Sequence, residues 1–172
     1  MAIDLSTALP YLSPALSPED TAPFHVYGSE DGPIVRPFSK TLIVNYVIDE
    51  PGALVFVRER DVRETLREDL HLCAIDNLRR RVARRPPRFE TKGATLHAKW
   101  DGQHDASLLL LDELWDHRSA DLVAAVPARD KLLFCEQRSD HTLAALRSHT
   151  EGENTSLSAE LFARKDKQWR PL

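Results

Sequence analysis

The sequence predicts an α+β fold, with a mostly antiparallel sheet and helices packed on it in repeated strand-strand-helix units. Three observations support this prediction. Short apolar segments come in pairs joined by turn residues, a helical pattern follows each pair, and the unit recurs about three times. The highest apolar density lies in residues 101–136, where a turn at Asp101-Gly102 precedes a leucine-rich segment and two strands. We therefore expect the core to form around this stretch.

The first forty residues hold six of the eleven prolines, at positions 10, 14, 18, 23, 33 and 37, which disfavours long regular elements there. We expect residues 1–39 to form a proline-rich wrap with one short strand at 24–27, and residues 40–172 to form a single α+β domain. Inside that domain, residues 42–48 and 54–57 are predicted strands, and the turn residues between them predict a hairpin.

A helix is predicted next, and its start is marked by the capping-box spacing of Thr65 and Glu68, in which each side chain satisfies a backbone N–H of the other. Apolar residues recur every four positions and predict one inward-facing side, made of Leu66, Leu70, Ala74, Leu78 and Val82. Pro86 ends the helix, and strands are predicted at 89–91 and 95–100.

The leucine-rich segment at 105–115 is predicted to be a helix capped by Asp105 or His104. One face of this helix would carry Leu108, Leu111 and Trp115. Trp115 is therefore predicted to be a core residue. Leu109 falls on the acidic side instead, so either the helix is covered on more than one side or Leu109 contacts something else.

Two continuous apolar strands are predicted at 122–126 and 131–136, joined as an antiparallel hairpin. Continuous apolar runs, in contrast to alternating ones, indicate strands that are covered on both faces. A helix starting at Asp140 and a closing hairpin at 161–164 and 168–170 complete the predicted order.

The composition limits the class of protein. A chain of 172 residues is expected to bury a sizeable core without disulfides, and its formal net charge of -4 gives no overall attraction to nucleic acid or anionic membranes. Cys73 and Cys135 are predicted to be buried free thiols. The sequence contains no signal-peptide pattern and no apolar run of membrane-spanning length, so we expect a cytoplasmic protein with no membrane partner.

No catalytic residue, metal site or cofactor is predicted, because the GxSxG, GxxxxGK[ST] and GxGxxG patterns do not occur. One metal hypothesis stays open, in which His97, His104 and Asp105 meet across a turn; the alternative is that they are turn or cap residues. Three acidic residues lie close together on the predicted central helix: Asp112, Glu113 and Asp116. Paired carboxylates can serve acid–base chemistry, but a solvated acidic face is the simpler interpretation.

The strongest charge cluster is formed by Arg79, Arg80, Arg81, Arg84, Arg85 and Arg88. Favourable interaction with the helix dipole accounts for one or two of these cations. The others need acidic partners, and three alternatives stay open: pairing with Glu59, Glu64, Glu68 and Asp69 of the same chain, an acidic protein, or RNA or DNA. Nucleic acid is the least favoured of the three, since only Phe89 lies near the arginines as a stacking residue.

Several sequence pieces together resemble a known family. They are Arg36-Pro37, Leu42-Ile43-Val44, Tyr46-Val47, Leu70-His71, Ala74, Asn77-Leu78-Arg79, the block from Asp105 to Trp115, the block from Val126 to Asp130, Leu161-Phe162, Asp166 and Trp169. This set is similar to the YtpQ-like family, a bacterial domain of unknown function (DUF 1444). The resemblance implies a single cytoplasmic bacterial domain, and it brings no activity and no catalytic residues.

These observations lead to the hypothesis of a non-catalytic protein-binding domain that acts by occupying a partner, such as an immunity-type inhibitor of a toxin or effector, or a secretion chaperone. The candidate partner-binding residues are Arg79, Arg80, Arg84, Arg88, Asp112, Glu113 and Asp116. Two alternatives remain, an enzyme whose site is assembled from distant residues and a nucleic-acid-binding module that uses the arginines.

Overall fold

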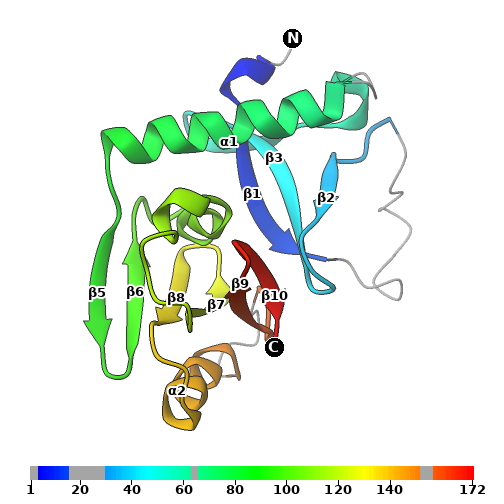
Figure 1. Ribbon diagram of the computed structural model, residues 1–172. Coiled ribbons are helices and arrows are strands. Elements are labelled where there is room, and N and C mark those ends of the chain that lie inside the picture. Colours follow the sequence, from blue (N-terminus) through cyan, green and yellow to red (C-terminus); the bar gives the residue numbers. More distant parts are fainter. Residues whose placement is uncertain (1–3, 16–29, 63–65, 152–156) are drawn as a thin grey trace. The chain divides into compact units, whose positions relative to one another are not determined.

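The computed structural model describes residues 4–15, 30–62, 66–151 and 157–172, and within them it confirms the predicted α+β fold (Figure 1). Its contacts divide the chain into two compact units, Met1–Arg84 and Arg85–Leu172, here called unit 1 and unit 2. The sequence predicts neither this division nor its position.

Unit 1 is a small antiparallel sheet with one long helix. The central strand β3 (Leu42–Glu50) pairs with β1 (Leu9–Pro14), β2 (Val35–Pro37) and β4 (Ala53–Phe56). The hairpin of β3 and β4 is the one predicted from the sequence. Short 3-10 helices lie at Leu5–Thr7 and Glu59–Asp61.

The strand β1 lies inside the segment that was expected to be a loose wrap, and five of its six residues are buried. It pairs with β3 along its whole length, from Leu9 opposite Val47 to Pro14 opposite Leu42. Proline is tolerated because β1 is an edge strand, where a missing N–H costs no ladder hydrogen bond on the open side. The predicted strand at 24–27 lies outside the described residues.

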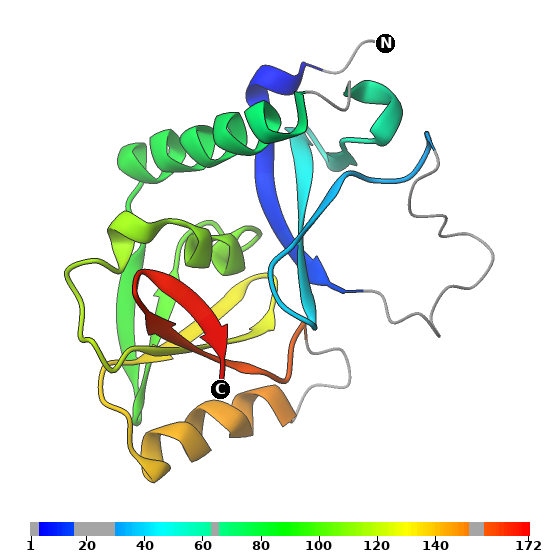
Figure 2. The same cartoon turned by 45° about the vertical axis from the view of Figure 1, so that its right-hand side comes forward.

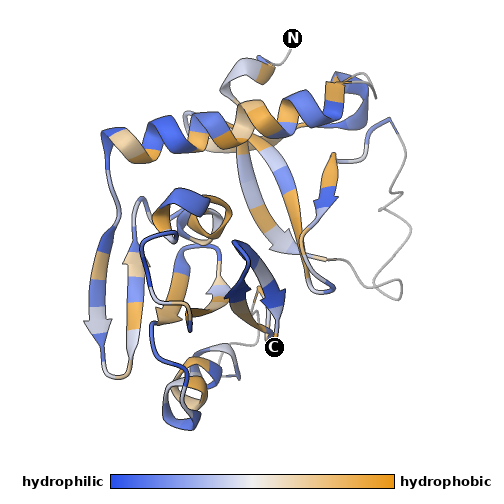
Figure 3. Ribbon diagram, viewed as in Figure 1, coloured by the Kyte–Doolittle hydropathy of each residue, from blue (hydrophilic) through white to orange (hydrophobic). Residues whose placement is uncertain are grey.

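The helix α1 (Arg67–Arg84) buries the face that the four-residue repeat predicts, with Leu70, Ala74, Leu78 and Val82 inside. Leu66, the first residue of that repeat, is 44% exposed because it precedes the helix. The predicted cap, Thr65, lies outside the described residues. Figure 3 shows hydrophobic and hydrophilic residues alternating along α1, as expected for a helix with one buried side.

A polar contact joins α1 to the sheet of unit 1. The hydroxyl of Tyr46 on β3 lies 3.0 Å from Nδ1 of His71 on α1. Burial raises the pKa of Tyr46 to about 12, and burial also lowers the pKa of His71. Both groups are therefore neutral at pH 7, and the contact is a hydrogen bond between uncharged side chains.

Unit 2 is a six-stranded antiparallel sheet built from three hairpins in the order β10-β9-β7-β8-β6-β5. The hairpins are β5 (Arg88–Lys92) with β6 (Thr95–Lys99), β7 (Val123–Ala128) with β8 (Lys131–Cys135), and β9 (Leu161–Lys165) with β10 (Gln168–Pro171). Asp166 and Lys167 both have positive φ, 52° and 63°, which suits the two-residue turn between β9 and β10. Pro127 was expected to end β7, but the strand continues past it to Ala128 through a shift in register.

The sheet of unit 2 is covered on both faces, as the continuous apolar runs of β7 and β8 predict (Figure 2). On one face, Leu143 and Leu146 of α2 (Asp140–Glu151) pack over a cluster made of Val123, Ala125, Leu133, Cys135 and Leu161. On the other face, Trp115 packs edge-to-face on Phe134 of β8, with ring centroids 5.3 Å apart. The predicted core position of Trp115 is confirmed, since it is 1% exposed.

The segment before Trp115 is not the α-helix that was predicted. It forms two 3-10 helices, η4 (Asp105–Leu110) and η5 (Asp112–Leu114), separated by an extended Leu111. Its apolar residues point in too many directions for one α-helical face, yet Leu108, Leu109, Leu111 and Trp115 are all buried. Two short 3-10 helices with a break at Leu111 allow all four side chains to be buried, because the chain changes direction between them. The indole N–H of Trp115 donates to the carbonyl of Leu108 at 3.0 Å.

The turn before η4 also differs from the predicted cap. Asp101 Oδ1 accepts hydrogen bonds from the backbone N–H groups of Gln103 and His104, while Asp105 Oδ1 accepts from those of Asp101 and Gly102. Asp105 therefore closes the turn and caps no helix. Among the described residues, no helix is long and apolar enough to cross a membrane.

Candidate functional site

The predicted arginine cluster is spread over both units. Arg79, Arg80 and Arg84 lie on α1 in unit 1, and all three are exposed. Arg88 opens β5 in unit 2, where its register partner is Lys99. The cluster thus divides into an α1 group of four (Arg79, Arg80, Arg81 and Arg84) and two residues of unit 2, Arg85 and Arg88.

Part of the α1 group is paired internally, but not with the predicted acids. Arg79 pairs with Asp76 one turn earlier, and Arg81 Nη2 lies 2.7 Å from Asp49 Oδ2 at the end of β3. Two of the predicted partners are engaged elsewhere: Glu59 with Arg67 at 2.5 Å and Glu68 with Arg36 at 2.5 Å. Glu64 lies outside the described residues.

Two of the α1 arginines have no ion pair among the described carboxylates. Arg80 makes a 3.4 Å hydrogen bond to Asn77 Oδ1, and Arg84 is exposed in the last turn. Both guanidinium groups are therefore left to solvent or to another molecule.

The predicted acidic face is largely used inside unit 2. Arg164, whose side chain is 8% exposed, lies 3.0 Å from Asp112 Oδ1 and 2.6 Å from Asp116 Oδ1. Lys167 Nζ lies 3.4 Å from the other oxygen of Asp116. The hydrogen bond from Arg164 lowers the pKa of Asp116. Glu113 is exposed on η5. Carboxylates already held by a buried arginine offer less charge to a partner, and their role in partner binding stays a prediction.

The residues of the metal hypothesis lie in different surroundings. His104 is fully buried, with Nδ1 3.0 Å from Asp101 Oδ2, whereas the His97 ring on β6 packs edge-to-face on His149 of α2 at 5.9 Å. In the described parts of the chain, no group of three or more His, Cys, Asp or Glu side chains could hold a metal ion.

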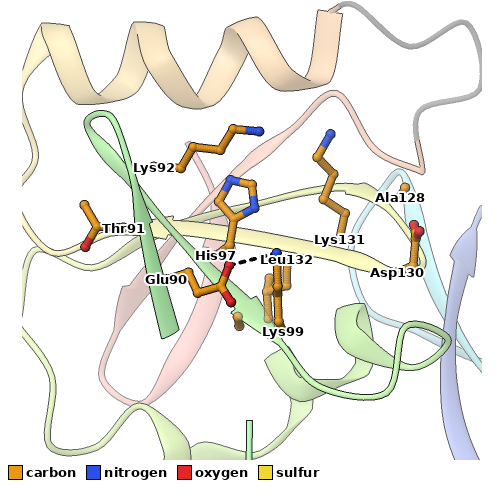
Figure 4. Close-up of a pocket in the computed structure, with 10 residues that line it drawn as sticks. Glu90, Thr91, Lys92, His97, Lys99, Ala128, Asp130, Lys131 and Leu132 are labelled. Carbon is orange, nitrogen blue, oxygen red and sulfur yellow. Dashed lines mark ion pairs between the residues drawn. The ribbon is translucent and has the colours of Figure 1, made fainter. Parts of the chain in front are cut away.

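A polar hollow that the sequence did not predict lies in unit 2, between β5, β6 and the turn from β7 to β8 (Figure 4). Its volume is about 640 Å³. The charged or titratable side chains that line it are Glu90, Lys92, His97, Lys99, Asp130 and Lys131.

Strand alternation places these side chains together. In the register of β5 and β6, Glu90 lies opposite His97 and Lys92 opposite Thr95, so alternate residues of both strands share one face. His97 is in turn opposite Leu133 of β8, a residue of the apolar cluster under α2. One face of the sheet is thus apolar where α2 covers it and polar on the neighbouring strands β5 and β6.

His97 is the buried centre of this polar region. It is 7% exposed, and its Nε2 has no hydrogen-bond partner among the described residues. Burial lowers its pKa, and the positive charges of Lys92, His149, Lys131 and Lys99 lower it further. His97 is therefore uncharged at neutral pH and lies in a field of positive potential.

The two cysteines lie in different units and form no disulfide with each other. Cys135 is buried, as predicted, and burial raises the pKa of its thiol; Cys73 is only partly buried. Under native conditions we expect a thiol reagent to label Cys73 faster than Cys135, because the thiolate is the reactive form and needs access. Unfolded protein should give two thiols, and labelling of Cys135 as fast as Cys73 would contradict its burial.

Comparison of the chain with protein-family models, with curated proteins and with solved structures finds no match in any of the three. The resemblance to the YtpQ-like family therefore rests on the residues quoted for it.

Proposed function

We propose that the chain is a non-catalytic protein-binding module that occupies an acidic surface of its partner. The observation that supports this proposal is the exposed surface of α1, which carries Arg79, Arg80 and Arg84 outside the buried stripe of the helix. Leu72, 56% exposed, lies two turns before Arg79 on the same side of the helix. Arginine beside an exposed apolar side chain is typical of the composition of protein interfaces.

The charge of this face favours an acidic partner. Between residues 72 and 84, α1 carries four arginines and a single carboxylate, Asp76. Asp76 forms an ion pair with Arg79, and Asp49 forms one with Arg81. Arg80 and Arg84 have no ion pair with a carboxylate of the described residues. A partner that supplies carboxylates would complete these pairs and would be drawn in by the same charges.

Two kinds of protein act by binding to and covering a surface of another protein. An immunity-type inhibitor covers the working surface of a toxin or effector, and a secretion chaperone or regulator covers a surface until it is needed. The proposal is common to both, because each needs a charged contact face and no reaction of its own.

The test is the triple charge reversal R79E/R80E/R84E. The protein captured by the parent chain from a lysate of its own cells is identified and purified, and its association with both chains is followed by stopped flow. We expect the association rate constant to fall at least tenfold at low salt, because charges at the rim of an interface act mainly on the rate of encounter. The melting temperature is expected to stay within a few degrees of the parent's.

A matched control is the variant R138E/R147E/R170E, which has the same change in net charge at three exposed arginines of unit 2. An equal loss of rate in the control would show that only total charge matters and would overturn the proposed face. Co-purification of nucleic acid with the parent, released steeply by salt, would assign the arginines to RNA or DNA instead. Arg88 is left unchanged because it lies next to the hollow on β5.

A further inference from the structure

We propose that the hollow of unit 2 is a binding site for a small phosphate-bearing anion, held by Lys92, Lys131 and His97. This inference goes beyond the proposed protein contact, which uses unit 1. It rests on the position of the lysines, the state of the carboxylates around them and the environment of the His97 ring.

The two lysines come from strands that are distant in sequence, and both line the hollow. Lys92 ends β5, Lys131 begins β8, and β6 with His97 lies between these strands in the sheet. In Figure 4 the side chains of Lys92 and Lys131 extend to the same side of the sheet as the His97 ring. Two ammonium groups beside an imidazole offer several N–H donors to one anion.

The carboxylates of the hollow do not cancel this charge. Glu90 is bound by Lys99, whose Nζ lies 2.8 Å from its Oε2, and this hydrogen bond lowers the pKa of Glu90. That pair is neutral as a unit. Asp130, in the turn before Lys131, is the other carboxylate of the lining, so three lysines line the hollow against two carboxylates.

The His97 ring is expected to be stabilised by a bound anion. A buried ring nitrogen without a hydrogen-bond partner costs free energy, and an acceptor oxygen from a ligand would relieve that cost when Nε2 carries a proton, as it does in the protonated ring. Burial is the main cause of the lowered pKa of His97, and a dianion near the ring would offset the second cause, the positive charges of Lys92, His149, Lys131 and Lys99. Phosphate esters carry about −1.5 to −2 charges at pH 7 and three acceptor oxygens, which suits this set of donors.

The size of the hollow points to a ligand larger than the free ion. Its volume of about 640 Å³ lies inside the range of roughly 300 to 1,000 Å³ that is common for small-molecule sites. We expect a phosphate monoester, whose remaining part occupies the space over β5 and the β7–β8 turn.

Binding is tested on the full chain by NMR titration with inorganic phosphate and with ribose 5-phosphate, at constant ionic strength in chloride. Amide shifts are expected in β5, β6 and the start of β8. Tighter binding of ribose 5-phosphate would identify a monoester as the ligand, and equal binding would identify the free ion. Shifts scattered over both units, or equal shifts with chloride alone, would overturn the site.

Variants distinguish the site from general charge attraction. K92A/K131A is expected to weaken phosphate binding at least tenfold, while the control K40A/K165A, at two exposed lysines that do not line the hollow, should change it less than twofold. Unchanged affinity in K92A/K131A would overturn the proposal. R79E/R80E/R84E should keep phosphate binding, so failure of this site and failure of the protein contact are separate results.

The pH dependence tests the role of His97. An anion that favours the protonated ring is bound more tightly as pH falls from 8 towards the lowered pKa of His97, because binding then takes up a proton. Sulfate is the probe, since it stays a dianion over this range. We expect at least a threefold gain in sulfate affinity between pH 8 and pH 6 for the parent and none for H97N. The same gain in H97N would assign the effect to His149 or another group and overturn the role of His97.

Discussion

Replacing Trp115 with alanine is expected to lower the free energy of unfolding of unit 2 by about 3 to 5 kcal/mol. The indole is 1% exposed and lies edge-to-face with Phe134 at 5.3 Å, with Trp169 at 5.6 Å and with Phe89 at 6.4 Å. Its removal leaves a cavity beneath η4, and the carbonyl of Leu108 loses the N–H that it accepts. The loss therefore combines transfer, cavity and hydrogen-bond contributions.

The measurement is urea unfolding followed by the fluorescence of the remaining tryptophans, Trp100 and Trp169, which both lie in unit 2. W115F is a graded variant, because it keeps an aromatic ring and loses only part of the volume and the N–H; its cost should be clearly smaller. Leu72, 56% exposed on α1, provides the control L72A with an expected change below about 0.5 kcal/mol. A W115A protein as stable as L72A would show that this ring does not support the sheet.

Replacing Leu78 with alanine is expected to lower the free energy of unfolding of unit 1 by about 2 to 5 kcal/mol. Leu78 is fully buried in the middle of α1, on the face that packs against the sheet of unit 1. The measurement is circular dichroism at 222 nm, to which the 18 residues of α1 contribute more than the 12 of α2. The same control, L72A, lies on the outward side of the same helix.

Together the two variants test the division of the chain after Arg84. All three tryptophans belong to unit 2, so fluorescence follows that unit and the helix signal is weighted towards unit 1. We expect W115A to move mainly the fluorescence transition and L78A mainly the circular dichroism transition. A single transition moved equally by both variants would favour the single domain of residues 40–172 that the sequence predicts.

Local patterns in the sequence predicted the local structure well. The four-residue repeat of α1, the hairpin at β3 and β4 and the apolar runs of β7 and β8 each depend on neighbours within a few positions. Such patterns decide which element forms because they set the propensity and the buried face together. The core position of Trp115 followed from the same reasoning even though its helix type did not.

Features that depend on distant pairing were not predicted. β1 became a strand despite Pro10 and Pro14 because β3 pairs with it from 28 to 38 residues later along the chain, from Pro14 opposite Leu42 to Leu9 opposite Val47. The hollow could be predicted only in part: the alternation of Arg88, Glu90 and Lys92 indicates a polar strand face, whereas Lys131 joins it through the pairing of β6 with β8. The 3-10 path of η4 and η5 reflects burial from several directions, which no single-helix pattern contains.

The sheet of unit 2 also determines an order of events during folding. Each of its three hairpins closes over two residues, Gly93-Ala94, Arg129-Asp130 and Asp166-Lys167, and hairpins of this kind form in about 1 to 10 μs. The pairings of β6 with β8 and of β7 with β9 instead close connections of more than twenty residues, whose entropy must be overcome before any contact is gained. The rate-limiting step of refolding is therefore expected to be the docking of preformed hairpins, with the β7–β8 hairpin as the template on which the other two assemble.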